Sequence, residues 1–201
     1  LLAVAVLADR RERRREVGTD QPAPARGLPA VDRHVPSYIT QDEVDALTHP
    51  AVGQPRNLRH DGEGFGFGHA HPDFATNPSG AVLTSPTLLI VDGAVDTMRE
   101  LLAPLSRATA DAPLVVVADN FSDDVLTTLA ANRRALNTPV LAAQAPQRDR
   151  IRLAELTGAT PVTEADLKAG YLPSSGMGRA SQWSSTGRST WVALTPDKTL
   201  K

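Results

Sequence analysis

Apolar residues along this chain gather into short unbroken runs, and between these runs they recur every three or four positions. Unbroken apolar runs are typical of strands that are covered on both faces, as in a parallel sheet. Such runs occupy 87–91 and 114–118, a weaker one occupies 140–143, and a fourth candidate is 160–163. The pattern therefore predicts a parallel sheet made of these strands.

The stretches between the runs have the spacing of amphipathic helices. The first begins at a capping box of Thr97 and Glu100, and its apolar residues follow at i, i+3, i+4 and i+7. These residues are Met98, Leu101, Leu102 and Leu105. A second helix is predicted behind Ser122, and a shorter third one over 151–156.

Alternating strands and helices with short links indicate an α/β fold, in which a βαβ parallel sheet with right-handed crossovers is flanked by helices. After Gly176 the composition shifts to Ser, Thr, Gly and Trp, which predicts an added β-hairpin region. Residues 1–61 lack the alternation. They read as a helix over 1–16 followed by a Pro-rich linker, in which Thr40 caps one short helix. We expect this unassigned part to be followed by a folded domain over 62–201.

The composition narrows the classes of function. The chain has 201 residues, 41% of them hydrophobic and 22% charged, and a formal net charge of −2, so it lacks the basic excess of nucleic-acid binders. Without cysteine, disulfides, thiolate metal sites and cysteine nucleophiles are excluded. The apolar start over 1–8 is shorter than the roughly 20 residues of a membrane helix. We expect a cytoplasmic protein that binds neither nucleic acid nor membranes.

Two aspartates follow predicted strands. Asp92 and Asp119 come at the carboxyl ends of strands, where α/β proteins commonly place ligands, and such a pair suits phosphoryl transfer or a metal. Each aspartate also precedes a helix, where its side chain can cap free amides, and no phosphate-binding loop accompanies the pair. Helix capping is the preferred interpretation.

A second candidate for chemistry is a group of histidines in a glycine-rich bend. His69 and His71 place two imidazoles on one side of an extended segment, with His60 and Asp73 nearby, and this set suits zinc or a related metal. A short His-x-His is also common in exposed loops. Because no catalytic set is complete, we expect no cofactor, no metal and no enzymatic activity. A metal-dependent enzyme built on His69 and His71 is kept as an alternative.

The two longer predicted helices carry more apolar surface than one inward face needs. Adjacent helix positions point about 100° apart, so Leu101 and Leu102 cannot both face the sheet. If Leu101 faces inward on the first helix and Leu129 on the second, further apolar residues lie toward the margin. These are Leu102, Leu105, Leu126, Ala130 and Ala131. Exposed apolar surface of this kind marks interaction sites; the alternative is that both helices are simply well buried.

The segment 77–92 reads NPSGAVLTSPTLLIVD and resembles the start of the apical-domain sheet of GroEL-type (group I) chaperonins. The resemblance continues in the same order through several segments: MRELL at 98–102, PLVVVADN at 113–120, LTTL at 126–129, VLAAQAP at 140–146 and LTGAT at 156–160. Upstream, single residues fall at the family's spacing: Gly62, Phe65, Gly68, Pro72 and Phe74. The resemblance spans roughly 62–194.

The resemblance implies an apical-domain-like fold, in a family whose apical domain captures non-native polypeptide and the co-chaperonin loop in an apolar groove between two helices. Carried over to this chain, the groove consists of one aromatic and five aliphatic residues: Phe74, Leu102, Leu105, Leu126, Ala130 and Ala131. We therefore expect binding of non-native or extended polypeptide. No ATPase activity of its own is expected, since the family's Asp-Gly-Thr-Thr phosphate motif is missing. A co-chaperonin or chaperonin subunits are further expected partners.

Two departures from the family bear on client binding. The family has aromatic residues where this chain has His69 and Asp73, and a valine pair where it has Ala130 and Ala131. Reducing two valines to alanines removes about 2–3 kcal/mol of potential apolar burial. The alternative function is therefore a structural or assembly module that keeps the apical fold and has lost client binding.

Overall fold

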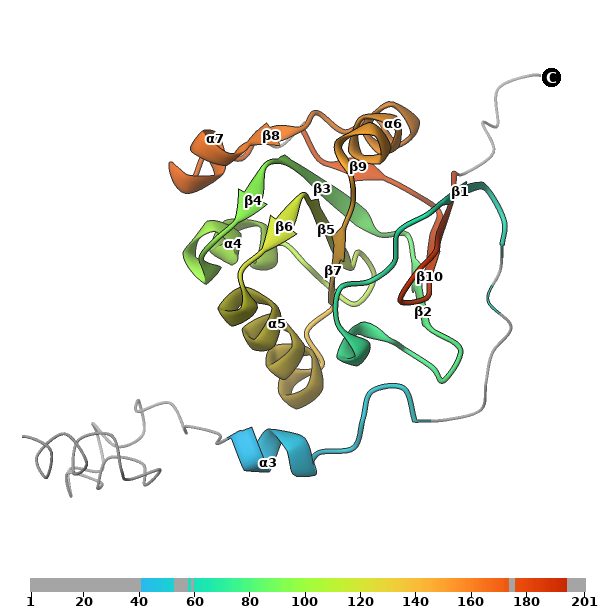
Figure 1. The fold of residues 1–201 in the computed structure, drawn as a ribbon, viewed down its shortest axis with the longest axis vertical. Coiled ribbons are helices and arrows are strands. Elements are labelled where there is room, and N and C mark those ends of the chain that lie inside the picture. Colours follow the sequence, from blue (N-terminus) through green and yellow to red (C-terminus); the bar gives the residue numbers. More distant parts are fainter. Residues whose placement is uncertain (1–40, 53–57, 59, 174–175, 195–201) are drawn as a thin grey trace, which may run out of the picture. The chain divides into compact units, whose positions relative to one another are not determined.

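The computed structural model describes residues 41–52, 58, 60–173 and 176–194 (Figure 1). Internal contacts divide the chain into two units, Leu1–Ala46 and Leu47–Lys201. Among the described residues, no helix has both the length and the hydropathy that crossing a bilayer requires.

The described part of the first unit is helix α3, Gln41–Ala46, which has acidic residues in its first turn. It confirms the short helix expected behind Thr40. The helix expected over 1–16 lies outside the described residues. The domain boundary expected between residues 61 and 62 falls inside the second unit and stays a prediction.

The second unit is built around a parallel sheet. Its strands are β3 (Thr87–Asp92), β5 (Leu114–Ala118), β7 (Val140–Gln144) and β8 (Val162–Thr163), in the spatial order β7-β5-β3-β8. Every residue of β5 is buried, as expected for a strand covered on both faces. The strand β9 (Gly178–Arg179) runs antiparallel to the first half of β3, while β8 pairs with its second half. The predicted α/β fold with a parallel sheet is confirmed.

Helices cover this sheet on both faces. They are α4 (Met98–Leu105), α5 (Asp123–Leu136), α6 (Gln147–Thr157) and the short α7 (Glu164–Lys168). The chain steps in one direction through β3, β5 and β7, so right-handed crossovers put α4 and α5 on the same face. The reverse step from β7 to β8 puts α6 on the opposite face (Figure 1).

The ends of the helices follow from local side chains. At α4, the N–H and the hydroxyl of Thr97 donate to Glu100 Oε1 over 3.2 and 2.9 Å, so the predicted capping box is present. At α5, Ser122 Oγ accepts the N–H of Val125 over 3.4 Å. Asn137 ends α5 in the left-handed conformation, with φ 51°.

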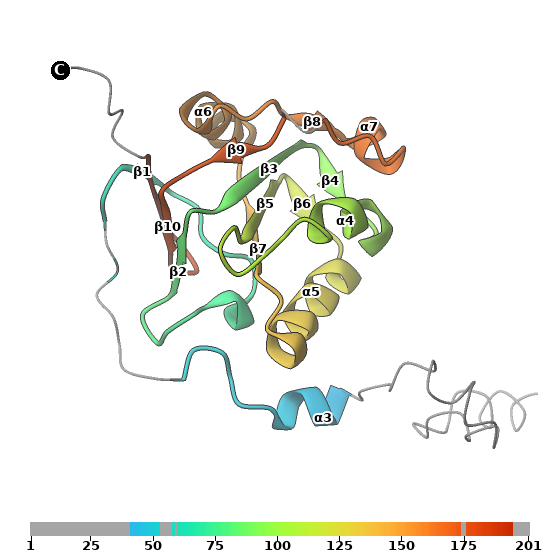
Figure 2. The ribbon, with the colours of Figure 1, turned by 180° about the vertical axis from the view of Figure 1, so that it is seen from behind.

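An antiparallel sheet stands beside the parallel one (Figure 2). Its order is β1 (Glu63–Phe65), β11 (Thr190–Ala193), β10 (Gln182–Ser185) and β2 (Ala81–Thr84). Its β10–β11 pair confirms the hairpin region expected after Gly176. The two outer strands precede the parallel sheet in the chain, and the sequence pattern did not predict them.

Three small elements complete the second unit. The strands β4 (Ala94–Val95) and β6 (Asn120–Phe121) form a two-stranded parallel sheet, and η1 (Pro72–Phe74) is a 3-10 turn. Buried apolar side chains from both larger sheets form one core. Trp183 of β10 is fully buried there, and its ring centroid lies 6.2 Å from that of Phe67.

Gly68 lies where two backbone segments approach closely. The N–H of the next residue, His69, donates to the carbonyl of Thr186 over 3.0 Å, and a Cβ at Gly68 would overlap the backbone of Thr186 and Gly187. At Gly66 a Cβ would meet no atom within 4 Å. The close approach therefore requires glycine at position 68 and not at position 66.

We expect Gly68→Ala to lower the free energy of unfolding by about 1–3 kcal/mol, because the added methyl group forces the two backbones apart. Gly66→Ala is the matched control and should change the free energy of unfolding by less than about 1 kcal/mol. Urea unfolding followed by tryptophan fluorescence measures both variants. Equal losses at the two positions would contradict the close approach.

Candidate functional site

Helix α4 packs one side inward and presents a leucine on the other. Leu101 is fully buried, whereas the side chain of Leu102 is 61% exposed and Leu105 is half-buried. This is the outcome expected for adjacent positions that point about 100° apart. The alternative in which both helices are simply well buried is wrong for α4.

Helix α5 shows a similar division between buried and partly exposed apolar residues. Val125 and Leu129 are fully buried, and Leu126 and Ala131 are half-buried. Ala130 is only 2% exposed, so it belongs to the inward side of the helix. The helices α4 and α5 pack against each other (Figure 1). The apolar residues that each helix leaves partly or fully exposed therefore belong to two neighbouring helices.

Phe74 does not reach the surface. It ends η1 and is 1% exposed, because η1 packs against α5 and β7 and turns the ring into the core. Phe74 and Ala130 therefore contribute almost no surface to a docked polypeptide, which corrects their expected place in an exposed groove. The apolar surface that remains consists of Leu102, Leu105, Leu126 and Ala131, and we name it the α4–α5 face. A continuous groove between the helices stays a prediction.

Asp73 is buried in a group of cationic and imidazole side chains. His49 Nε2 lies 2.9 Å from Asp73 Oδ1, and Arg134 Nη1 lies 3.8 Å from Asp73 Oδ2. Arg134 also donates to the carbonyl of Leu47, over 2.8 Å from Nη2. Asp73 thus links η1, α5 and the segment around Leu47. Although the family has an aromatic residue at this position, Asp73 is buried and adds no polar group to the exposed surface of α4 and α5.

The three histidines of the glycine-rich bend point to separate partners. His69 Nδ1 lies 3.1 Å from Ser185 Oγ, His71 Nδ1 accepts the N–H of Asp73 over 3.2 Å, and the His60 ring stacks on Trp191 at 4.0 Å. In the part of the chain that the structure describes, no three His, Cys, Asp or Glu side chains are arranged to hold a metal ion. The structure therefore does not bring His69 and His71 together as ligands.

Burial changes the titration of one of these histidines. His69 is half-buried next to β7, where it bridges to Ala143, and this burial lowers the pKa of His69. Desolvation disfavours the charged imidazolium, and it outweighs the opposing hydrogen bond with Ser185. His69 is therefore a largely neutral side chain near neutral pH.

Asp92 and Asp119 share one buried cation. Arg150 Nη1 donates to Asp119 Oδ1 over 2.7 Å, and Arg150 Nη2 donates to Asp92 Oδ1 over 3.4 Å. Arg150 Nη1 also donates to the carbonyl of Ala145 over 2.7 Å. The guanidinium thus joins the carboxyl ends of β3 and β5 to the residue that follows β7.

This arrangement overturns the expected capping role of the two aspartates. The N-cap of α4 is Thr97 and that of α5 is Ser122, while both aspartates point to Arg150. The arginine is 6% exposed, and the carboxylates it holds are more than half exposed. Sequence reasoning missed Arg150, because no local motif marks an arginine of α6 as the partner of two strand ends.

No family model matches this chain. Among solved structures, it is similar to the chaperonin gp146 from the bacteriophage EL 2 (Pseudomonas aeruginosa), with 18% sequence identity and a TM-score of 0.49. The similar region covers 70% of this chain and 30% of the phage chaperonin.

We expect His69→Gln to flatten the pH dependence of stability. Because the folded state disfavours the charged imidazolium, unfolding takes up a proton below the ordinary histidine pKa of about 6.5. The contribution of neutral His69 is fully present above that pH and is lost as the pH falls below it. Urea unfolding between about pH 5 and 7.5 measures the slope, with His60→Gln as the control for loss of a histidine. Equal slopes in the parental and His69→Gln proteins would contradict the effect of burial.

We expect Arg150→Met to lower the free energy of unfolding by about 1–3 kcal/mol, because it leaves two neighbouring carboxylates and one carbonyl without their shared donor. Arg152→Met is the matched control on the same helix. Its exposed ion pairs with Glu63 and Glu155 contribute about 0–1 kcal/mol. Comparable losses from the two substitutions, measured by urea unfolding, would show that Arg150 does not join the strand ends.

Proposed function

We propose that this chain binds non-native or extended segments of other polypeptides through the α4–α5 face, without catalysing a reaction. The observation that carries the proposal is the 61% exposure of Leu102 on a helix whose neighbouring Leu101 is fully buried. When a partner covers an exposed apolar side chain, the burial of that side chain stabilises the complex. Because the helix is already folded and packed, binding does not require the helix to reorganise.

The binding free energy expected from burial of these leucines corresponds to moderate affinity. Burial of one leucine side chain contributes about 1.5–3 kcal/mol, and each 1.4 kcal/mol or so changes the dissociation constant tenfold. Leu102, Leu105 and Leu126 together can therefore hold an apolar segment with moderate affinity. Segments with leucine-like anchors at helical or alternating spacing would fit such a face best.

The sequence resemblance supports the same residues. Leu102, Leu105 and Leu126 are positions carried over from the polypeptide-binding groove of group I chaperonin apical domains. In this chain Leu102 is exposed, and Leu105 and Leu126 are half-buried and pack partly against the core. Binding of this kind acts by mass action, because it lowers the free concentration of aggregation-prone chains. A co-chaperonin loop or chaperonin subunits would be partners of the same chemistry.

A second candidate is a structural or assembly module without client binding. The burial of Phe74 and Ala130 favours it, because these two residues then add nothing to the exposed apolar area. In this case Leu102 would be an isolated exposed leucine, as occurs on many soluble proteins.

The test compares Leu102→Asp combined with Leu105→Asp against the parental protein. We expect the parental protein to reduce light scattering from a client enzyme diluted out of denaturant, and to bind a fluorescein-labelled amphipathic peptide at least about tenfold more tightly than the variant. Leu102→Asp alone is included in case the double variant unfolds. We expect this single variant to stay folded, because the side chain of Leu102 is exposed and its loss leaves the core intact. Fluorescence anisotropy measures the peptide affinity.

The matched control is Leu136→Asp, which places the same charge at a leucine that is 73% exposed at the end of α5, outside the α4–α5 face. This control should behave as the parental protein. Equal client protection by the parental protein and by the α4 variants would contradict the proposal. Negligible binding of both the peptide and an apolar dye by the parental protein would favour the structural module.

A further inference from the structure

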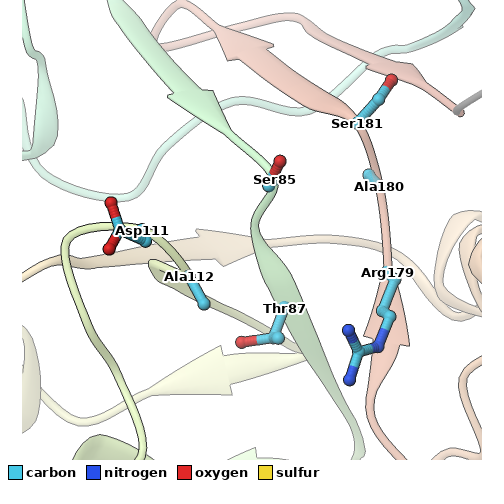
Figure 3. A pocket seen from close by; sticks show the side chains of 7 residues that line it. All are labelled: Ser85, Thr87, Asp111, Ala112, Arg179, Ala180 and Ser181. Atoms are coloured by element: carbon cyan, nitrogen blue, oxygen red, sulfur yellow. The ribbon is translucent and has the colours of Figure 1, made fainter.

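A cavity of about 280 Å³ opens at the amino-terminal edge of the parallel sheet (Figure 3). Three segments form it: the turn from Ser85 to Thr87 that leads into β3, the loop at Asp111 that precedes β5, and the end of β9 at Arg179 with the link to β10 that follows it. The cavity lies at the sheet edge opposite Arg150, and none of the residues that line it belongs to the α4–α5 face.

Opposite charges line the two sides of this cavity. Asp111 stands on the loop at one side and Arg179 on β9 at the other, with Thr87 between them (Figure 3). The pairing of Arg179 with Thr87 in the β9–β3 ladder fixes the backbone of the arginine beside the floor of the cavity. Within the described residues, neither charged side chain makes a hydrogen bond or an ion pair, so both are available to a ligand.

Hydroxyl groups complete the lining. The hydroxyl of Ser85 has no hydrogen-bond partner among the described residues. Thr87 Oγ1 donates to the carbonyl of Pro113 over 3.4 Å, which leaves its lone pairs free to accept. The cavity therefore offers a cation, an anion and two neutral hydrogen-bonding groups around one small volume.

The floor of the cavity includes a strained residue. Ser85 has φ 51°, in the left-handed region that non-glycine residues seldom adopt, and the proline that follows it restricts its backbone further. Two hydrogen bonds hold the turn in place: Ser85 N–H donates to the carbonyl of Ser181 over 2.9 Å, and Ala180 N–H donates to that of Pro86 over 3.2 Å. Strain of this kind is concentrated at ligand sites, where it fixes a side chain in a useful position.

From this arrangement we propose that the cavity binds a small zwitterion, with its carboxylate toward Arg179 and its ammonium group toward Asp111. A simple anion would meet the repulsion of Asp111, and a simple cation would meet that of Arg179. A molecule that carries both charges can pair with Arg179 and with Asp111, and its ammonium group can also donate to Thr87 Oγ1. The volume suits a ligand of the size of a free amino acid.

The test is a titration of the ¹⁵N-labelled full chain, followed by backbone amide chemical shifts. The probes are glycine, β-alanine and 5-aminopentanoate, which carry the same two charges at increasing separation. Propionate and ethylammonium are the matched single-charge controls for β-alanine. We expect at least one zwitterion to shift the amides of Ser85, Ala112 and Ala180, and to bind about tenfold or more tightly than either single-charge control.

Two variants test the contributions of Arg179 and Asp111 separately. Arg179→Gln and Asp111→Asn should each weaken zwitterion binding about tenfold or more, whereas Arg188→Gln, at an exposed hairpin turn, should leave it unchanged. The amide spectrum of each variant reports whether it is folded. Absence of shifts with all three zwitterions, equal binding of propionate and β-alanine, or unchanged binding in a folded Arg179→Gln protein would each overturn the proposal. Leu102→Asp should leave this binding unaffected, so the outcome is independent of the α4–α5 face.

Discussion

The central strand β5 has no residue that reaches solvent, because it pairs with a strand on each edge and lies under a layer of side chains on each face. Such a strand is stable only if helices cover both faces of the sheet, since its side chains are apolar in both directions. Leu101, Val125 and Leu129 supply this cover from α4 and α5 and are themselves fully buried. The remaining surface of the two helices is then left to solvent, with Leu102 on it.

At the carboxyl edge of the same sheet, one buried side chain joins the strand ends. In many α/β proteins this edge receives the ligand. Here the guanidinium of Arg150 fills the space between Asp92 and Asp119 and reaches the carbonyl of Ala145. The arginine comes from α6, on the opposite face from α4 and α5, so it also ties the helix of one face to the strand ends. The two surfaces that we propose for recognition lie elsewhere, on the outer side of α4 and α5 and in the cavity at the amino-terminal edge.

These two surfaces differ in chemistry and in what they can recognise. The α4–α5 face consists of aliphatic side chains. Its interaction with a partner would be hydrophobic and therefore non-directional, so apolar segments of different sequence could bind there. The cavity presents Arg179 and Asp111 on opposite sides, so it constrains the charge pattern and the size of a ligand. The family resemblance bears on the first surface alone. The second follows from the meeting of three segments that are far apart in the chain.

The strands of the parallel sheet, the helices α4 and α5 and the inward position of Leu129 were predictable from the sequence, because the spacing of apolar residues and the capping box at Thr97 are local properties. The strands β1, β2, β4 and β6 were not predicted. The sequence by itself therefore determined the parallel sheet and its crossovers. It left open whether Leu102 is exposed or covered, which the packing of α4 decided. It could not reveal that Phe74 is buried, since η1 is too short to carry a periodic pattern. Nor could it reveal that Asp73 pairs with His49 and Arg134, or that Asp92 and Asp119 share Arg150. Only the tertiary structure decided these contacts, because which distant side chains meet depends on how the layers pack and not on the order of residues within one element.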